Sequence, residues 1–272
     1  MVQNLLLISS WKQKKEVEKN KMKTFTLATT TLFAASTYAK MSNIQALLQD
    51  LAASEAGDSS DAATRTLSAG WANSMVESID GYGCWCYFEN DHGKGKGHAK
   101  NDVDAQCKIL HDGYSCIFMD AEEEKQDGCV PWLAEYVEPT GLGWWAKTGD
   151  DEGMKNALRK DCVKRNKKGD DSWCAQKACI VEGYFSINLF NLLTSGVKYD
   201  QNLLHKRGRF DPNEECAVIK GPAADRECCG EYPIRFPYKH MPGKRECCGT
   251  ATYNAEFLQC CDNKHAAITC DN

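Results

Sequence analysis

Sixteen cysteines in a chain of 272 residues restrict what this sequence can fold into more than any other feature. So many thiols do not persist unpaired in a reducing cytosol unless they bind metal. The Cys-x2-Cys pairs that are typical of zinc sites are absent, and adjacent cysteines rarely bind one ion together. The sequence therefore predicts disulfides and an oxidising compartment.

The cysteines divide evenly along the chain. Eight lie between residues 84 and 179 and eight between 216 and 270, so each half can close its own disulfides. This parity predicts a domain boundary, with the polar segment 196–212 as the linker. The second half repeats adjacent cysteines among proline, glycine and tyrosine and contains few apolar residues. For residues 213–272 we therefore predict a double-cysteine module of short strands and turns held by disulfides.

The N-terminal residues have the pattern of a secretory signal. Met22 and Lys23 supply a positive start, residues 25–35 an apolar run too short to span a bilayer, and residues 37–39 a small-residue cleavage site. We expect a signal-peptide region at 1–39, with translation starting at Met22, and export of the mature protein. Residues 40–66 are predicted to be a propeptide or linker that includes a short amphipathic helix.

Two cysteine-bearing segments have the periodicity of amphipathic helices. Apolar or cysteine residues recur at positions 103, 107, 110, 114 and 117, and again at 174, 178, 181, 185, 189 and 192. Asp171 fits the N-cap of the second helix. Such helices can be cross-linked, for instance by Cys107 or Cys116 to Cys174 or Cys179, although spacing alone does not assign the partners.

His111 and Asp112 lie outside the apolar stripe of the first helix, beside it and behind it. At about 100° per residue, they stand roughly 80° and 180° from its centre. The glycine-rich segment upstream can present carbonyl oxygens to a hard cation such as calcium, which also requires a carboxylate. Asp112 is the nearest candidate for that carboxylate, which leaves His111 to act as a general base toward water.

These residues resemble the secreted phospholipase A2 family. Its calcium loop has the sequence Tyr-Gly-Cys-aromatic-Cys followed by glycines, and its active helix carries Cys, three residues and His-Asp. Residues 82–86 match the loop, and Cys107 with His111 and Asp112 matches the helix. The chain departs from the family in the insert that begins at Tyr87 and in Lys108, which replaces the second of two paired cysteines. The likeness extends over residues 71–193 at most.

The resemblance implies a mainly α, disulfide-rich fold, with an antiparallel helix pair and a calcium loop in a domain at residues 67–195. It also implies hydrolysis of a glycerophospholipid ester at a phospholipid membrane surface or micelle, with His111 and Asp112 as catalytic residues. The implied cofactor is calcium (Ca2+). Its expected ligands are the Asp112 carboxylate and loop carbonyls, at Trp85, Tyr87, Gly93 and Gly95.

A histidine base works best when its other ring nitrogen donates to an acceptor. The resembling family keeps an aspartate for this role just after a cysteine of the second helix, where this chain has Ala175. Glu182 stands about 80° from the centre of the second stripe, as His111 does from the first. We expect Glu182 to orient the histidine, with Asp171 as the second candidate and a surface-exposed Glu182 as the alternative.

Other charged stretches are predicted to be solvated. The acidic run 120–127 is predicted to be a loop, although its residues 122–124 are the second candidate for a calcium site. The basic stretch 155–168 could face anionic lipid, but a solvated face is commoner. Isolated histidines are predicted to lie at the surface: His92, His98, His205, His240 and His265.

The adjacent cysteines of residues 213–272 are similar to those of galaxin-type matrix proteins, which implies an extracellular matrix protein as the partner of this module. The net charge of −5 argues against binding to nucleic acid. Two further functions stay open. One is a catalytically inactive lipid- or calcium-binding matrix protein on the same scaffold, and the other is a toxin-like or lipid-carrying protein that binds calcium without turnover.

Overall fold

The computed structural model describes residues 43–55, 74–75, 77–88, 94–169, 171–195, 199–218 and 225–270. The expected signal peptide and Gly93 lie outside these residues. Helices predominate, and every cysteine is in a disulfide. The prediction of a mainly helical, disulfide-rich chain is therefore confirmed. In the described part of the chain, no helix has the length and apolar character needed to cross a membrane.

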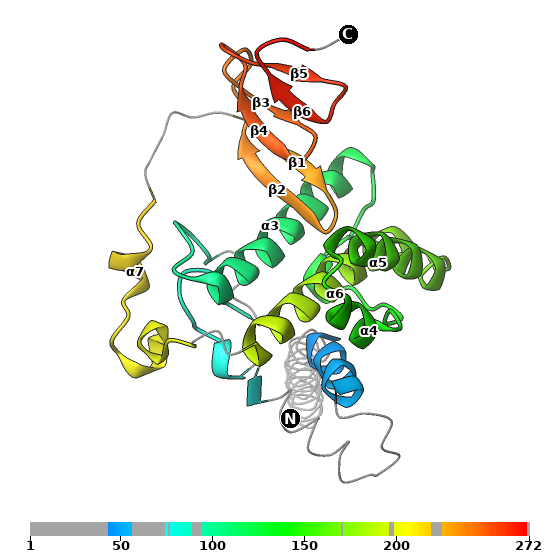
Figure 1. Cartoon of the computed structure of the whole chain (residues 1–272), viewed down its shortest axis with the longest axis vertical. Coiled ribbons are helices and arrows are strands. Elements are labelled where there is room, and N and C mark those ends of the chain that lie inside the picture. Colours follow the sequence, from blue (N-terminus) through cyan, green and yellow to red (C-terminus); the bar gives the residue numbers. More distant parts are fainter. Residues whose placement is uncertain are drawn as a thin grey trace, which may run out of the picture. The chain divides into compact units, whose positions relative to one another are not determined.

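Two long helices lie side by side in the middle of the fold, α3 (Asp102–Glu123) and α6 (Ser172–Thr194) (Figure 1). They run antiparallel, because Cys129, just beyond the end of α3, is bonded to Cys174 at the start of α6. The helices approach closely at Gly113, where a Cβ atom would come within 2.8 Å of Val181 Cγ1. The apolar periodicity predicted both helices, and Asp171 occupies the N-cap position of α6.

Shorter elements cover this pair. The helix at residues 43–55 buries the apolar stripe that its sequence predicted, and its leucines join the same core as α3 and α6. On the helical side, α4 (Leu142–Thr148) and α5 (Asp151–Arg165) pack against α6, and Lys147 of α4 forms an ion pair with Glu55. The connections contain further short turns: η1 (Pro131–Leu133), η2 (Gln201–Leu203), η3 (His205–Arg207) and α7 (Pro212–Glu215).

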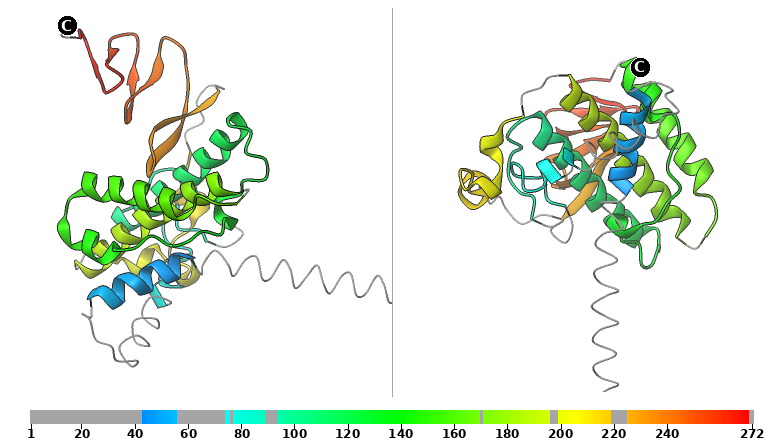
Figure 2. Two further views of the ribbon diagram at one scale, coloured as in Figure 1. Left: turned by 90° about the vertical axis from the view of Figure 1, so that its right-hand side faces the viewer. Right: turned by 90° about the horizontal axis from the view of Figure 1, so that it is seen from below.

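The C-terminal residues form three two-stranded antiparallel hairpins in succession (Figure 2). Their strands are β1 (Arg226–Glu231), β2 (Ile234–Lys239), β3 (Arg245–Cys248), β4 (Ala251–Asn254), β5 (Gln259–Cys261) and β6 (His265–Ala267). The first strand of each hairpin carries a pair of adjacent cysteines. The second cysteine of one pair is bonded to the first of the next, through Cys229–Cys247 and Cys248–Cys260. The predicted strands and turns held by disulfides are present.

Two disulfides join a cysteine of the first eight, between residues 84 and 179, to one of the last eight, between residues 216 and 270. Cys84 is bonded to Cys216, and Cys116 of α3 is bonded to Cys228 of β1. The expectation that each half closes its own disulfides is therefore wrong, because even counts permit crossing pairs as readily as separate ones.

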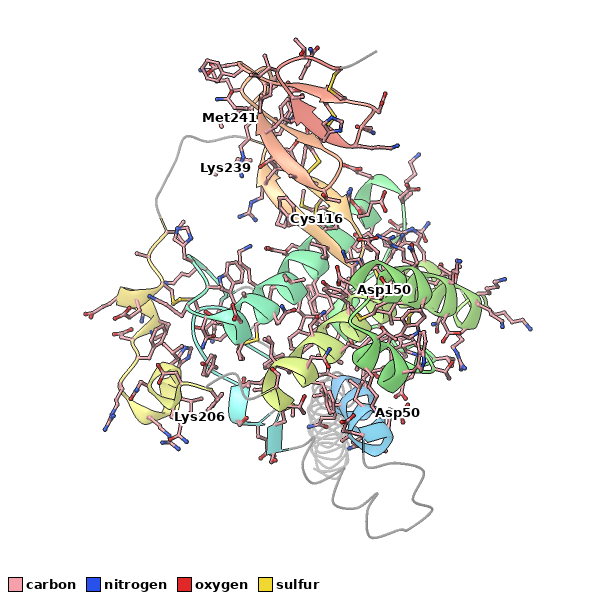
Figure 3. All side chains as sticks on the ribbon, in the orientation of Figure 1. Asp50, Cys116, Asp150, Lys206, Lys239 and Met241 are labelled. Atoms are coloured by element: carbon pink, nitrogen blue, oxygen red, sulfur yellow. A yellow bond between two sulfur atoms is a disulfide. The ribbon has the colours of Figure 1, made fainter. Side chains whose placement is uncertain are left out.

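The expected direct cross-link between the two long helices is also wrong. Cys116 lies where α3 meets the first hairpin (Figure 3) and so faces β1 rather than α6. The other cysteine of α3, Cys107, is bonded to Cys86. No disulfide therefore joins α3 directly to α6.

Candidate functional site

The cysteine loop, residues 81–88, is fixed to the first turn of α3 by a buried carboxylate. Asp104 accepts hydrogen bonds from the backbone N–H groups of Cys84 at 2.8 Å, Trp85 at 2.7 Å and Lys100 at 2.9 Å. Gly83 has φ of +60°, and a Cβ atom there would lie 2.4 Å from the carboxyl carbon of Asp104, so only glycine fits. Asp104 was missed by sequence reasoning.

Residues 199–216, which include most of the expected linker, hold the loop from its other side. The Gly83 N–H donates to the carbonyl of Leu203 at 2.9 Å, and the His205 N–H donates to the carbonyl of Gly81 at 2.9 Å. The His205 ring nitrogen Nε2 lies 2.7 Å from the carbonyl of Gly83 and must donate, since a carbonyl only accepts. The disulfide from Cys84 to Cys216 adds a covalent tie.

The prediction that the isolated histidines lie at the surface is wrong for His205. This residue is half-buried, and its ring stacks on Phe210 with 5.5 Å between the ring centroids. The reason is that its ring satisfies a loop carbonyl. His98 and His265 are exposed as predicted, and His240 is half-buried beside Glu227. His92 lies outside the described residues.

Gly95, one of the residues expected to bind calcium, packs against the Trp85 ring. A Cβ atom on Gly95 would come within 2.4 Å of Trp85 Cε3, and the Trp85 indole N–H donates to the carbonyl of Gly97 at 3.2 Å. The Trp85 carbonyl accepts from the Tyr87 N–H at 2.8 Å, which leaves it a second lone pair. The structure therefore brings Trp85 and Gly95 together, whereas the Tyr87 ring turns toward His205 at 5.3 Å.

His111 and Asp112 lie buried on the same side of α3 as the Trp85 ring. The centroids of the His111 and Trp85 rings are 6.3 Å apart. Lys108 connects the helix to the loop, because its ammonium lies 5.1 Å from the Trp85 ring centroid and forms an ion pair with the Asp112 carboxylate. Burial raises the pKa of Asp112, and the positive charges of Lys108 and Arg226 oppose that shift.

Glu182 is fully buried, so the alternative of a surface-exposed side chain is wrong. Its two carboxylate oxygens accept hydrogen bonds from the hydroxyls of Tyr114 and Tyr136, both at 2.6 Å. Burial, together with the negative charge of Glu182, raises the pKa of both tyrosines well above the ordinary value. The phenols therefore remain protonated donors. Sequence reasoning had no signal for Tyr136.

The register of the two helices places Glu182 near the level of His111. With Gly113 against Val181 in an antiparallel pair, His111 stands level with Gly183. Glu182 is one residue away, about 1.5 Å along the axis. The second candidate, Asp171, is exposed at the start of α6, about 16 Å further along the axis.

The acidic run behaves differently from its prediction as a solvated loop. Its first residues complete α3, and Asp120 forms an ion pair with Arg235 of β2 at 2.8 Å. The side chains at positions 122–124, the second candidate for a calcium site, are exposed. Nowhere in the described ranges do three or more acidic, histidine or cysteine side chains gather as metal ligands.

Substitution of Asp104 by asparagine is expected to lower the free energy of unfolding by about 2 kcal/mol. The NH2 group of the amide would face backbone N–H groups whose hydrogen bonds the carboxylate accepts in the native protein. Chemical denaturation of the oxidised protein measures the effect. The matched control is Asp102→Asn, which removes an exposed carboxylate from the same helical turn. Equal stability of the two variants would show that Asp104 does not hold the loop.

No protein-family model, curated protein or solved structure matches the chain.

Proposed function

We propose that this protein is a secreted, calcium-dependent hydrolase of glycerophospholipid esters, with a phospholipase A2-like domain in residues 67–195. One observation carries the proposal: a buried His111–Asp112 pair lies beside a glycine-containing loop that Asp104 holds in place, and the loop's Trp85 ring is within 6.3 Å of the His111 ring. The eight disulfides are consistent with an extracellular protein.

His111 takes the proton from the attacking water as general base. Its orientation is assigned to Glu182, which stands near the same level on the facing helix. The Tyr114 contact supports this assignment, because a helical side chain leans toward the N-terminus of its helix. The Tyr114 hydroxyl, and with it the Glu182 carboxylate, therefore lies over the turn that contains His111. Glu182 is a positioning residue, since it acts through the histidine.

Asp112 supplies the only charged oxygen ligand for calcium in this proposal, and the carbonyls of Trp85, Tyr87, Gly93 and Gly95 supply neutral ones. The donor set fits a hard cation that binds carboxylate and carbonyl oxygens. When bound, calcium polarises the ester carbonyl and stabilises the oxyanion. Gly93 lies outside the described residues. The fit therefore rests on Trp85 and Gly95, which pack together, and on Asp112, whose ion-pair partner Lys108 lies over the Trp85 ring.

The decisive experiment measures release of fatty acid from phospholipid vesicles with calcium and with a chelator. The native protein is expected to release fatty acid only with calcium, and Asp112→Asn is expected to lose both calcium binding and hydrolysis. Calcium affinity that is unchanged in Asp112→Asn would place the ion elsewhere. Calcium binding without hydrolysis by the native protein would favour a binding protein instead.

Lys108 competes with calcium for Asp112, because its ammonium already pairs with that carboxylate. Replacement by methionine keeps a long unbranched side chain at this position and removes the competing charge. We expect Lys108→Met to raise calcium affinity about tenfold at pH 8, the worth of one charge-assisted hydrogen bond. Calorimetric titration measures the change, with the exposed Lys160→Met as the matched control.

The gain in calcium affinity of Lys108→Met should shrink as the pH falls. Lys108 lowers the pKa of Asp112 against the effect of burial, so its loss raises that pKa further. A protonated carboxyl does not bind calcium, and the variant therefore loses affinity earlier than the native protein on acidification. Calcium affinity equal to that of the native protein at pH 8 would show that Lys108 does not compete.

The same ion pair favours a second candidate, a catalytically inactive extracellular protein on this scaffold. With Lys108 at Asp112, the carboxylate is neutralised without calcium. In that role the hairpins of residues 213–272 would provide the contact with an extracellular matrix protein. The vesicle experiment separates the two candidates, because only the hydrolase releases fatty acid.

A further inference from the structure

A pocket of about 430 Å³ lies where α3, α5 and α6 meet the first hairpin. The charged residues in its lining are Asp120, Arg159, Lys177, Glu231 and Arg235, and Tyr232 forms part of its wall. Asp120 is nine residues beyond His111 on α3, about 13 Å along the helix axis. The volume is within the range of pockets that bind small molecules, about 300 to 1,000 Å³.

One acid–base pair in the lining is already neutralised. Arg235 binds both carboxylate oxygens of Asp120, at 2.8 and 2.9 Å, and gives a further hydrogen bond to the Gly230 carbonyl at 2.7 Å. The Tyr232 hydroxyl also donates to Asp120, at 2.7 Å. This pair therefore joins the hairpin to α3 and has little capacity left for a ligand.

The second pair is open to exchange. The Arg159 guanidinium lies 3.2 Å from Glu231, whose side chain is 76% exposed. Such surface ion pairs contribute about 0 to 1 kcal/mol, so a better anion can replace Glu231 at little cost. The Arg159 side chain stays in position meanwhile, because its Nε group donates to the carbonyl of Tyr232.

Lys177 carries a positive charge that no described carboxylate neutralises within ion-pair distance. Its ammonium lies 4.9 Å from the ring centroid of Tyr232 and 5.6 Å from that of Trp173. Burial lowers the pKa of Lys177; Arg235 and Arg159 lower it further, and Asp120 and Glu124 oppose them. A half-buried ammonium among other cations is the arrangement that an anion would stabilise.

We propose that this pocket binds the phosphate group of a small phosphate monoester or of a lipid headgroup, with Lys177 as the anchor and Arg159 as the second donor. The charges match: once Glu231 turns to solvent, two cations face the ligand, and a phosphate monoester carries about −1.5 to −2 at neutral pH. Arg159 offers the planar donor geometry that phosphate prefers. The proposal is independent of hydrolysis at His111.

The test uses the full chain and three probes: inorganic phosphate, glycerol 3-phosphate, and phosphatidylcholine vesicles with and without phosphatidate. Lys177→Gln is expected to weaken binding of the phosphate probe at least about tenfold, whereas the exposed Lys160→Gln on α5 should leave it unchanged. Lys177-dependent binding of a soluble probe identifies a free phosphate ligand. Lys177-dependent binding of phosphatidate vesicles alone identifies a headgroup. Equal affinity of all proteins for every probe overturns the proposal.

A second measurement needs no variant and so does not depend on how Lys177→Gln folds. The native protein is treated with an amine-acylating reagent, and the labelling rate of each lysine is followed by peptide mass spectrometry. Phosphate in the pocket should slow labelling of Lys177 severalfold and leave Lys160 unaffected, because bound anion favours the unreactive ammonium form. Labelling of Lys177 that no probe slows would also overturn the proposal.

Discussion

Replacement of His111 by glutamine is expected to lower calcium-dependent hydrolysis of phospholipid about a thousandfold, while calcium affinity changes less than about twofold. A positioned general base contributes about 10² to 10⁴ in rate, and glutamine cannot accept the proton. The imidazole is not among the proposed calcium ligands, so affinity should survive. Initial rates of fatty acid release and calorimetric calcium titration provide the two measurements.

The matched control for this substitution is His265→Gln, at an exposed position of β6. Its rate should equal that of the native protein. If His111→Gln hydrolysed phospholipid at the native rate, the general base would have to be another group. A parallel loss of calcium binding in His111→Gln would instead indicate that the substitution disturbs the cysteine loop through Trp85. The Trp85 ring lies 6.3 Å from the imidazole of His111.

The long helices could be predicted because their information is local. Each has an apolar stripe at helical spacing, and the stripe of α3 continues unbroken through Val103, Cys107 and Leu110, all buried. The pairing of the cysteines could not be predicted, since neither parity nor spacing decides between connectivities. Cys116 illustrates the difficulty: its helix was correct, but its partner depends on a hairpin that begins 110 residues later.

Only part of the candidate site could be predicted from local sequence. The cysteine loop and the His111–Asp112 pair were proposed from short motifs. Helical geometry placed Glu182 toward α3, where it accepts a hydrogen bond from Tyr114. The second hydrogen bond to Glu182 comes from Tyr136, which lies 46 residues away in an irregular segment. An acidic residue in a first helical turn next to the stripe is a signal that could have singled out Asp104. His205 had none, because its partner Gly83 is 122 residues distant.

Removal of the disulfide between Cys116 and Cys228 is expected to lower the free energy of unfolding by about 3 kcal/mol. Its sequence separation of 112 residues would suggest about 4.8 kcal/mol from chain entropy alone. Two other disulfides, Cys84–Cys216 and Cys86–Cys107, provide a shorter path between Cys116 and Cys228. Through them the unfolded, oxidised chain already connects the two cysteines by a path of about two dozen residues, which lowers the entropic gain.

The disulfide between Cys162 and Cys179 provides a comparison, because it closes an interval of only 17 residues. Chain entropy then predicts a loss of about 3 kcal/mol for this bond as well. Each double cysteine-to-alanine variant is to be unfolded with guanidinium under non-reducing conditions. If the other disulfides shorten the path between Cys116 and Cys228 in the unfolded chain, the free energies of unfolding of the two variants should differ by about 0.3 kcal/mol. The sequence separations alone would give a difference near 1.7 kcal/mol, with the variant lacking Cys116–Cys228 less stable. That result would contradict the shorter path through Cys84–Cys216 and Cys86–Cys107.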